Sequence, residues 1–171
     1  MNLDDREYGF FKVSDLFDVK YGVNLELNSC KKCNWNIKDS VNFVSRTSKN
    51  NGVSSRVLTI DDITPQKAGL ISVAAGGSVL STFLQLEPFY SGRDLYTLEA
   101  KNNISDEAKI FVITVIKQNK YKYSYGRQAN KTLPNLELRL PVKQDGKPDW
   151  KFMENYIKYL HNKSFVKKEE S

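Results

Sequence analysis

Cysteine and histidine are scarce in this sequence, with two and one among 171 residues. Two cysteines are too few for the disulfide framework of a small secreted domain. Cys30 and Cys33 have the spacing of half a zinc site, but there is no second pair and His161 lies far along the chain. A structural zinc site needs four ligands. We therefore expect two reduced thiols in a loop, with no metal and no cofactor.

Long apolar runs are also missing. None approaches the roughly 20 residues that a helix needs to span a bilayer. The N-terminal MNLDDREYGF has neither the basic start nor the apolar stretch of a signal peptide. These absences predict a cytoplasmic protein without a membrane partner.

Motifs of familiar enzymes are absent as well. Residues 74–78, AAGGS, lack the Gly-Lys-Ser/Thr ending of a nucleotide P-loop, so a tight turn is expected there. A nucleophile with a histidine base is poorly supported, because His161 is the one histidine. Asp94, Glu99 and Lys101 loosely resemble the two carboxylates and lysine of Mg²⁺-dependent nucleases, but their spacing is short. The sequence predicts a non-catalytic protein, with a nuclease as the alternative.

What the chain does have is an excess of positive charge. Lysine and arginine number 26 against 20 acidic residues, for a net charge of +6 and a pI near 9.2. That balance suits an anionic partner, although many basic proteins bind none. With 40% hydrophobic residues, a chain of this length forms a globular domain that buries about two-thirds of its unfolded surface.

Apolar patterns predict many short strands. They fall at 41–47, 56–60, 69–73, 79–85, 94–100 and 136–141, separated by turn signals such as Asn51-Gly52. Residues 10–22 form an apolar opening segment with Ser14 as a candidate helix N-cap, and residues 87–93 form a loop. The predicted fold class is α+β: one mixed domain over residues 1–160, with short, mainly antiparallel strands, a buried helix and a C-terminal amphipathic helix.

Two helices have recognisable starts. Ser105 caps a mostly apolar helix over 106–119, which we expect to be buried. Asp149 caps a second helix of about three turns, followed by a charged, frayed tail over 161–171. Its apolar stripe either closes the domain's own core or binds a partner helix, and it consists of Trp150, Met153, Ile157 and Leu160.

The segment from Lys117 to Lys131, KQNKYKYSYGRQANK, holds five basic side chains, three tyrosines and no acid. Basic groups neutralise phosphates, while tyrosines offer flat faces and hydroxyls to bases and backbone oxygens. The same composition also suits a solvated edge strand with tyrosines in the core. Both interpretations remain open on composition alone.

Several segments occur in an order typical of one family: SRTSKNNGVSSRV, ISVAAGGSV, FYSGRDLYTLEAK, KYSYGRQAN and LPNLELRLPVKQDGKPDWKFMENYI. From about Phe11 to Leu160 the chain resembles the target recognition domain of bacterial restriction–modification specificity subunits, chiefly the type I subunit. Similar domains form the C-terminal part of fused restriction–methylation enzymes. The resemblance implies a DNA-specificity role, with methyl transfer and cleavage in partner subunits.

The resemblance also suggests which loops contact duplex DNA. Exposed arginine suits guanine and asparagine suits adenine in the major groove. The predicted DNA-binding residues are Arg46, Thr47, Ser48, Lys49, Asn50 and Asn51 in one loop, Arg93 in a second, and Lys122, Tyr125, Arg127, Gln128, Asn130 and Lys131 in a third. Alternatively, the first loop is a polar hairpin turn and Arg93 pairs with Asp94.

The chain departs from this family in one respect. A complete type I specificity subunit resembles two recognition domains joined by long helices, whereas this chain carries one. We therefore expect one of three origins: a half-subunit that forms a homodimer or joins a second recognition domain, a truncated chain, or a domain of a larger fused enzyme. A protein-interaction module with an incidental basic face is a further alternative.

Overall fold

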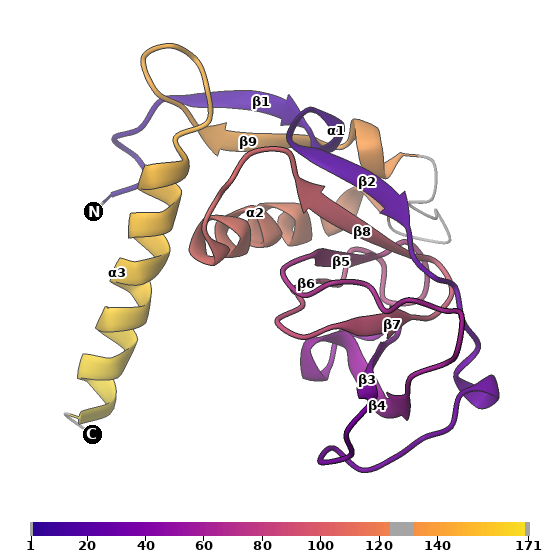
Figure 1. Ribbon diagram of the computed structural model, residues 1–171. Helices are drawn as coiled ribbons and strands as arrows, with labels where there is room; N and C mark the ends of the chain where they lie inside the picture. Colours follow the sequence, from indigo (N-terminus) through magenta and orange to yellow (C-terminus); the bar gives the residue numbers. More distant parts are fainter. Residues whose placement is uncertain (1, 124–131, 170–171) are drawn as a thin grey trace.

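The computed structural model describes residues 2–123 and 132–169, in which nine strands, three α-helices and four short 3-10 helices follow one another (Figure 1). The strands are β1 (Tyr8–Lys12), β2 (Phe17–Tyr21), β3 (Ser40–Val44), β4 (Val53–Leu58), β5 (Ile71–Ala74), β6 (Thr82–Leu84), β7 (Phe89–Ser91), β8 (Leu95–Ala100) and β9 (Glu137–Pro141). The α-helices are α1 (Val13–Leu16), α2 (Asp106–Gln118) and α3 (Trp150–Glu169). The 3-10 helices are η1 (Leu27–Ser29), η2 (Asn50–Gly52), η3 (Asn119–Tyr123) and η4 (Leu133–Asn135).

The strands form three small sheets. The largest has the order β2-β8-β5-β6 and is antiparallel throughout. Strands β1 and β9 form an antiparallel pair, while β4-β3-β7 combines an antiparallel pair with a parallel one between β3 and β7. Figure 1 shows β1 and β9 above α2, and the three-stranded sheet at the lower right. The predicted α+β class with mainly antiparallel strands is confirmed.

Helix α2 lies at the centre of the main hydrophobic core. Its N-cap is Ser105, whose hydroxyl accepts a hydrogen bond from the Ala108 amide at 3.3 Å, as predicted. Phe111, Val112 and Ile116 are buried among side chains of the four-stranded sheet, the β1–β9 pair and α3. Because apolar residues cover most of this helix, it is stable only when surrounded, and the prediction of a buried helix is confirmed.

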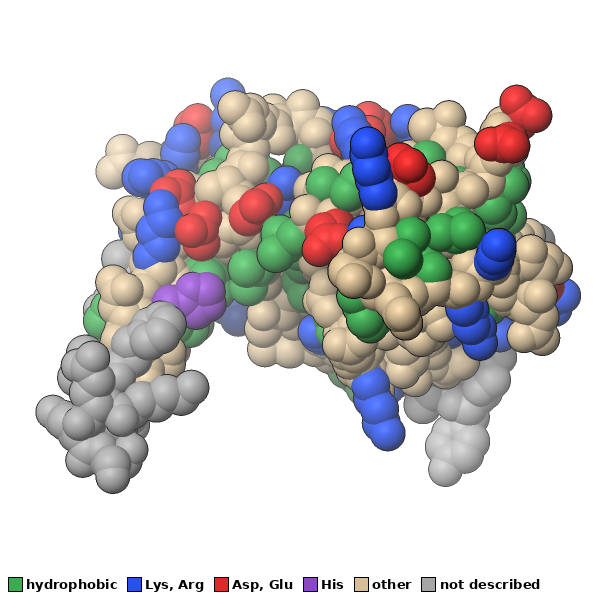
Figure 2. All heavy atoms as spheres, turned by 60° about the horizontal axis from the view of Figure 1, so that its bottom comes forward, with side chains coloured by type: hydrophobic (Ala, Val, Ile, Leu, Met, Phe, Trp, Pro, Cys, Tyr) green, Lys and Arg blue, Asp and Glu red, His purple; other side chains and the backbone are tan. Residues whose placement is uncertain are grey.

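Helix α3 is longer than predicted. Its N-terminal amide at Phe152 is capped by the Asp149 carboxylate at 3.0 Å. The helix then continues to Glu169, so the prediction that it ends after about three turns, near residue 160, is wrong. No glycine or proline interrupts residues 151–169, and the lysines and glutamates there favour helix. Figure 1 shows α3 extending past the rest of the described fold, and Figure 2 shows the single histidine of the chain, in purple, on that side of the molecule.

Three strands escaped prediction. The opening segment holds β1 and β2 on either side of α1, a single turn whose N-cap is Lys12 rather than Ser14. Strand β7 lies in the predicted loop 87–93 and pairs in parallel with β3. It has three fully buried residues, too few to show a periodic pattern. Tertiary pairing, not local pattern, makes these segments strands.

Among the described residues, no helix combines the length and the apolar character needed to cross a membrane.

Candidate nucleic-acid interface

Three loops meet at one end of the sheets, and we call them the loop cluster. They are residues 45–52 between β3 and β4, residues 75–81 between β5 and β6, and residues 92–94 between β7 and β8. The Ala75 amide donates to the Asp94 carbonyl at 2.8 Å, and the Ser78 amide donates to the Arg46 carbonyl at 3.4 Å. Two predicted DNA-contacting loops are thus brought together, with the AAGGS turn between them.

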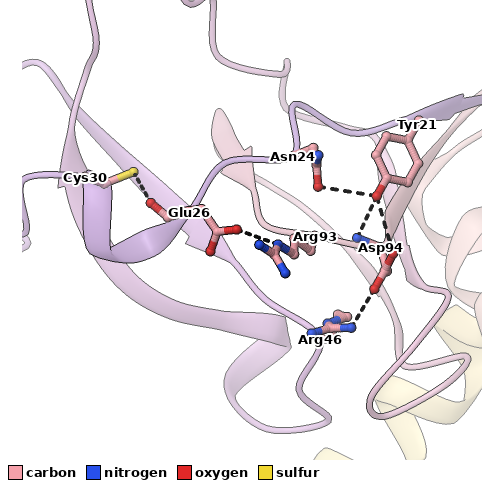
Figure 3. Close-up of polar contacts among 7 residues, drawn as sticks. All are labelled: Tyr21, Asn24, Glu26, Cys30, Arg46, Arg93 and Asp94. Atoms are coloured by element: carbon pink, nitrogen blue, oxygen red, sulfur yellow. Dashed lines mark hydrogen bonds and ion pairs between the residues drawn. The ribbon is translucent and has the colours of Figure 1, made fainter.

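An ion pair joins these loops. Arg46 Nη1 donates to Asp94 Oδ2 at 2.6 Å, and both side chains are partly shielded from solvent. The Asp94 amide in turn donates to the Tyr21 hydroxyl oxygen at 2.9 Å (Figure 3). Asp94 has a φ of 52°, a left-handed conformation that costs free energy outside glycine. The surrounding contacts therefore hold Asp94 in place to receive the guanidinium.

The Gly76-Gly77 pair makes room for Arg46. A Cβ atom at Gly76 would lie 3.2 Å from Arg46 Nη1, and one at Gly77 would lie 3.1 Å from Arg46 Cβ. Gly77 also has a φ of +62°, which favours glycine. The predicted tight turn after β5 is confirmed, and its additional role is a close approach to the arginine.

Arg93 has a different partner from the one predicted. The alternative to DNA contact was pairing with Asp94, but Arg93 Nε pairs with the Glu26 carboxylate, on the segment between β2 and β3 (Figure 3). The side chains of Arg93 and Glu26 are 65% and 54% exposed. An exposed pair of this kind contributes at most about 1 kcal/mol and is readily exchanged for another partner.

The asparagines of loop 45–52 support the turn itself. The amide groups of Asn50 and Asn51 donate to the carbonyls of Val53 and Leu84, at 2.9 and 3.0 Å. Both asparagines have positive φ angles, of 47° and 55°. These bonds favour the alternative prediction of a polar hairpin turn for the two residues.

The other predicted residues of that loop are placed differently. Ser48 and Lys49 are exposed, and the Thr47 hydroxyl accepts a hydrogen bond from the Lys49 amide at 3.2 Å. The loop thus presents a cation and a hydroxyl to solvent, at positions that its own backbone fixes. Their role in DNA binding stays a prediction.

The start of the basic segment lies beside this loop. Lys117 and Lys120 line a depression of about 230 Å³ together with Ser48 and Ser81. The Lys117 ammonium lies 4.4 Å from the centroid of the Phe83 ring. Although the side chain as a whole is exposed, burial of its ammonium lowers the pKa of Lys117. The positive charge of the segment is therefore continuous with that of the loop cluster.

The remainder of the basic segment is only partly described. Lys122 belongs to η3, and its side chain lies outside the description. The other predicted contacts of the third loop lie outside the described residues: Tyr125, Arg127, Gln128, Asn130 and Lys131.

Three functional candidates were missed by the sequence interpretation. Tyr21 ends β2, Asn24 and Glu26 follow it, and all three reach the loop cluster from the side opposite Arg46 (Figure 3). Asn24, like Asp94, has a positive φ, of 60°. No local motif marks these residues, because they become neighbours of Asp94 only through the pairing of β2 with β8.

The nuclease alternative is not favoured by the geometry. Asp94 precedes β8 and Glu99 lies near its far end, a separation of roughly 17 Å for an extended strand. Glu99 pairs with Lys67, whose hydrogen bond lowers the pKa of that carboxyl, and Lys101 donates to the Ser14 carbonyl. Among the described residues, no group of three or more His, Cys, Asp or Glu is arranged to hold a metal ion.

The two cysteines are not joined in a disulfide. Cys30 and Cys33 are both partly exposed, and the Cys30 thiol donates to the Glu26 carbonyl at 3.4 Å. Burial raises the pKa of Cys30, which makes it a weaker nucleophile and a weaker metal ligand than an ordinary thiol.

The predicted partner stripe on α3 is divided between core and surface. Met153 and Ile157 are buried and pack against the core around α2, and Trp150 is partly buried there. Leu160 is 41% exposed at the rim of an apolar groove of about 750 Å³. Phe10 also lines this groove and is 68% exposed. The first three residues follow the intradomain interpretation, and Leu160 remains available at the surface.

Known proteins with similar sequences and folds belong to one group. The family model for the type I restriction modification DNA specificity domain matches residues 5–167. The specificity subunit S.BcgI of a type II restriction enzyme from Heyndrickxia coagulans is 30% identical over 164 residues, covering 95% of this chain and 46% of that protein.

Solved structures with the same fold have much lower identity. The S subunit of a type I restriction-modification system from M. genitalium has a TM-score of 0.62 at 18% identity, covering 85% of this chain and 37% of that one. The HsdS subunit from Thermoanaerobacter tengcongensis has a TM-score of 0.65 at 12% identity, covering 100% and 41%. The chain thus spans less than half the length of these relatives. Since the family model spans nearly all of it, the chain belongs to the family of type I restriction modification DNA specificity domains.

Proposed function

We propose that this chain recognises duplex DNA in a sequence-specific way, as a non-catalytic specificity component of a restriction–modification system. The observation that carries the proposal is the convergence of three polar loops at one end of the sheets, with Arg46 and Arg93 on these loops and Lys117 of α2 beside them. Loops held by a rigid scaffold are the usual place for binding residues. Family membership gives the ligand class.

The chemistry divides into anchoring and readout. Lysines such as Lys49 and Lys120 neutralise phosphates, which supplies affinity without sequence information. Arginine, with its planar set of five N–H donors, reads guanine edges in the major groove. The third predicted loop adds Arg127, Gln128 and Asn130 to the readout. Methyl transfer and cleavage are assigned to partner subunits, since the nuclease triple Asp94, Glu99 and Lys101 does not converge.

Partner binding is proposed for the groove beside α3. Phe10 and Leu160 leave apolar surface exposed at this groove. Exposed apolar surface of this extent is typical of protein interaction sites. One proposed occupant is a second recognition domain or a second copy of this chain, which the greater length of the relatives supports. The other proposed occupant is a methyltransferase subunit.

A DNA-binding measurement tests the main proposal. The full chain, alone and with a methyltransferase subunit from the same system, is titrated with a duplex library and with a single competitor duplex at several salt concentrations. We expect binding that weakens steeply with salt and a sequence preference that competitor DNA does not abolish. The double variant Lys117→Ala and Lys120→Ala should weaken all duplexes equally. Lys147→Ala is the matched control, because this exposed lysine follows β9, away from the loop cluster.

The proposal is contradicted if Lys147→Ala weakens DNA binding as much as the double variant Lys117→Ala and Lys120→Ala does. Absence of any DNA binding at low salt would instead favour the alternative of a protein-interaction module.

Partner binding has its own test. Leu160→Ser should weaken association with the methyltransferase subunit or with a second copy, measured by light scattering during gel filtration. Because Leu160 is partly exposed already, the thermal midpoint of unfolding should change little. Met153→Ser, at a buried position, is the contrasting variant, which should unfold the chain. Unchanged association for both Leu160→Ser and Phe10→Ser would exclude the groove as the interface.

A further inference from the structure

We propose that Arg46 is a specificity-determining residue that reads one guanine, and that Asp94 is the residue that positions it. This inference rests on the proposed function and deepens it, since it assigns base readout and phosphate contact to different arginines of the same loop cluster. Arg93 is assigned to the phosphate backbone.

The first observation is the unequal environment of the two ion pairs. The side chains of Arg46 and Asp94 are 38% and 25% exposed, whereas those of Arg93 and Glu26 are 65% and 54% exposed. A half-shielded pair loses less of its attraction to solvent than an exposed one. Arg46 therefore keeps one orientation, while Arg93 can leave Glu26 for a phosphate. Fixed orientation is what base readout needs and what phosphate contact does not.

The second observation is that the backbone closes in on Arg46 from the side. A Cβ atom at Gly76 or Gly77 would crowd the Arg46 side chain, at 3.2 Å from its Nη1 and 3.1 Å from its Cβ atom. The Ser78 amide bonds the Arg46 carbonyl, and the Thr47 amide bonds the Ser45 carbonyl at 2.8 Å. Both the backbone and the guanidinium of Arg46 are thus restrained before any DNA arrives, which reduces the entropy lost on binding.

The third observation concerns what holds Asp94. Its amide is bound by the Tyr21 hydroxyl oxygen at 2.9 Å, and its carbonyl accepts from the Ala75 amide at 2.8 Å. The Tyr21 ring packs edge-on against Tyr96, with centroids 5.1 Å apart. Asp94 is therefore tied to β2, β5 and β8 at once, and it transfers the rigidity of the four-stranded sheet to Arg46.

The chemistry of the guanidinium completes the argument. A carboxylate on Nη1 uses one of five N–H donors and leaves the others for a ligand. Guanine presents two acceptors, O6 and N7, in the major groove, and arginine meets both at once. Lysine carries the same charge but lacks the planar donor pair. Asparagine at position 94 keeps the size of the side chain but removes the charge that holds the guanidinium.

Selection from a randomised duplex DNA library tests the assignment, with the full chain as the probe-binding protein. Wild-type protein should enrich guanine at one position of the selected DNA. Arg46→Lys and Asp94→Asn should each reduce this enrichment by about tenfold or more. Preferences at the other positions should persist. Arg93→Lys, at a residue assigned to phosphate contact, should alter the affinity for all sequences alike and change no base preference. Lys147→Ala, away from the loop cluster, is the matched control and should change neither. Tyr21→Phe, which keeps the ring packing, should relax the same single position to a smaller extent.

Two outcomes overturn the assignment. In the first, Arg46→Lys protein has the thermal midpoint of wild type and keeps the wild-type preference for guanine. In the second, Arg93→Lys loses the guanine preference as strongly as Arg46→Lys does. If wild-type protein enriches no sequence at all, the proposed function itself fails, and that result is distinct from a retained preference in the variants. Should Asp94→Asn unfold the chain, Tyr21→Phe and Arg46→Lys still decide the question.

Discussion

The core around α2 and the loop cluster owe their structures to different kinds of interaction. Around α2, many apolar side chains share one volume, and Ile116 and Met153 are fully buried within it. In the loop cluster, a few contacts decide the conformation, such as Gly77 against Arg46 and Asn51 against Leu84. A core of the first kind is encoded by periodic apolar patterns, whereas a site of the second kind depends on single residues that no pattern announces.

The largest expected effect is in the core. Ile116→Ala removes a fully buried side chain from α2, and we expect a loss of about 3 kcal/mol in the free energy of unfolding. Chemical denaturation monitored by circular dichroism measures it. If the variant remains folded, it should keep the wild-type sequence preference for DNA, because Arg46 and Asp94 are held by contacts with each other, with Tyr21 and with the Gly76-Gly77 turn. A changed preference would show that the two regions are coupled.

The success of sequence interpretation follows the same division. The buried helix and its Ser105 cap were predictable, because apolar periodicity and a capping serine are local signals. Strands β1 and β7 were not predictable from local patterns. Strand β1 exists through its pairing with β9, which is far away in the sequence, and β7 exists through its parallel pairing with β3. The length of α3 was also underestimated, because a charged tail was equated with fraying although its residues favour helix.

The second effect tests the close approach in the loop cluster. Gly77→Ala puts a Cβ atom 3.1 Å from Arg46 Cβ at a φ of +62°. We expect about 1–2 kcal/mol of destabilisation from the backbone conformation alone, measured by thermal unfolding. DNA sequence preference should fall as well, because Arg46 is displaced. Gly146→Ala is the control: it has a similar φ of +76° but nothing within 4 Å of the added atom.

The contrast between these two glycines separates strain from displacement. If Gly77→Ala and Gly146→Ala lose the same stability but only Gly77→Ala loses DNA sequence preference, the result supports the role of the turn in holding Arg46. Equal loss of preference in both variants contradicts it.

A smaller effect is expected at Asn51. Its amide donates to the Leu84 carbonyl while its φ is 55°, so Asn51→Ala loses a hydrogen bond and gains strain, about 1 kcal/mol in total. Asn51→Gly should be milder, because glycine accepts this φ without strain. Both are measured by denaturant titration. If Asn51→Gly instead loses preference for adenine at one DNA position, the original prediction of base readout by Asn51 regains its support.

The loops of the candidate site could be chosen from the sequence, but the contacts among them could not, and their role in DNA binding stays a prediction. The loops that hold residues 46–51 and Arg93 were selected for their exposed donors, yet the partner of each arginine was not predicted. Asp94 was considered for a nuclease site and as a partner of Arg93, and it binds Arg46, which lies 48 positions away. Tyr21 reaches Asp94 from 73 positions away. Contacts of such sequence separation require the topology, which local patterns do not contain.

The smallest effect on stability, and the cleanest on DNA, belongs to Lys120. This lysine is exposed beside Ser48 at the edge of the loop cluster, so Lys120→Ala should change the free energy of unfolding by less than about 0.5 kcal/mol. If the lysine contacts one phosphate, the slope of log K against log salt should become shallower by about 0.9, equally for all sequences. Fluorescence anisotropy at four salt concentrations measures this slope. A core variant such as Ile116→Ala shows the opposite pattern, with lower stability and an unchanged slope. If Lys120→Ala leaves the slope unchanged while Lys147→Ala reduces it, the phosphate-contacting surface lies on the β9 side of the molecule and the division between core and loop cluster must be redrawn.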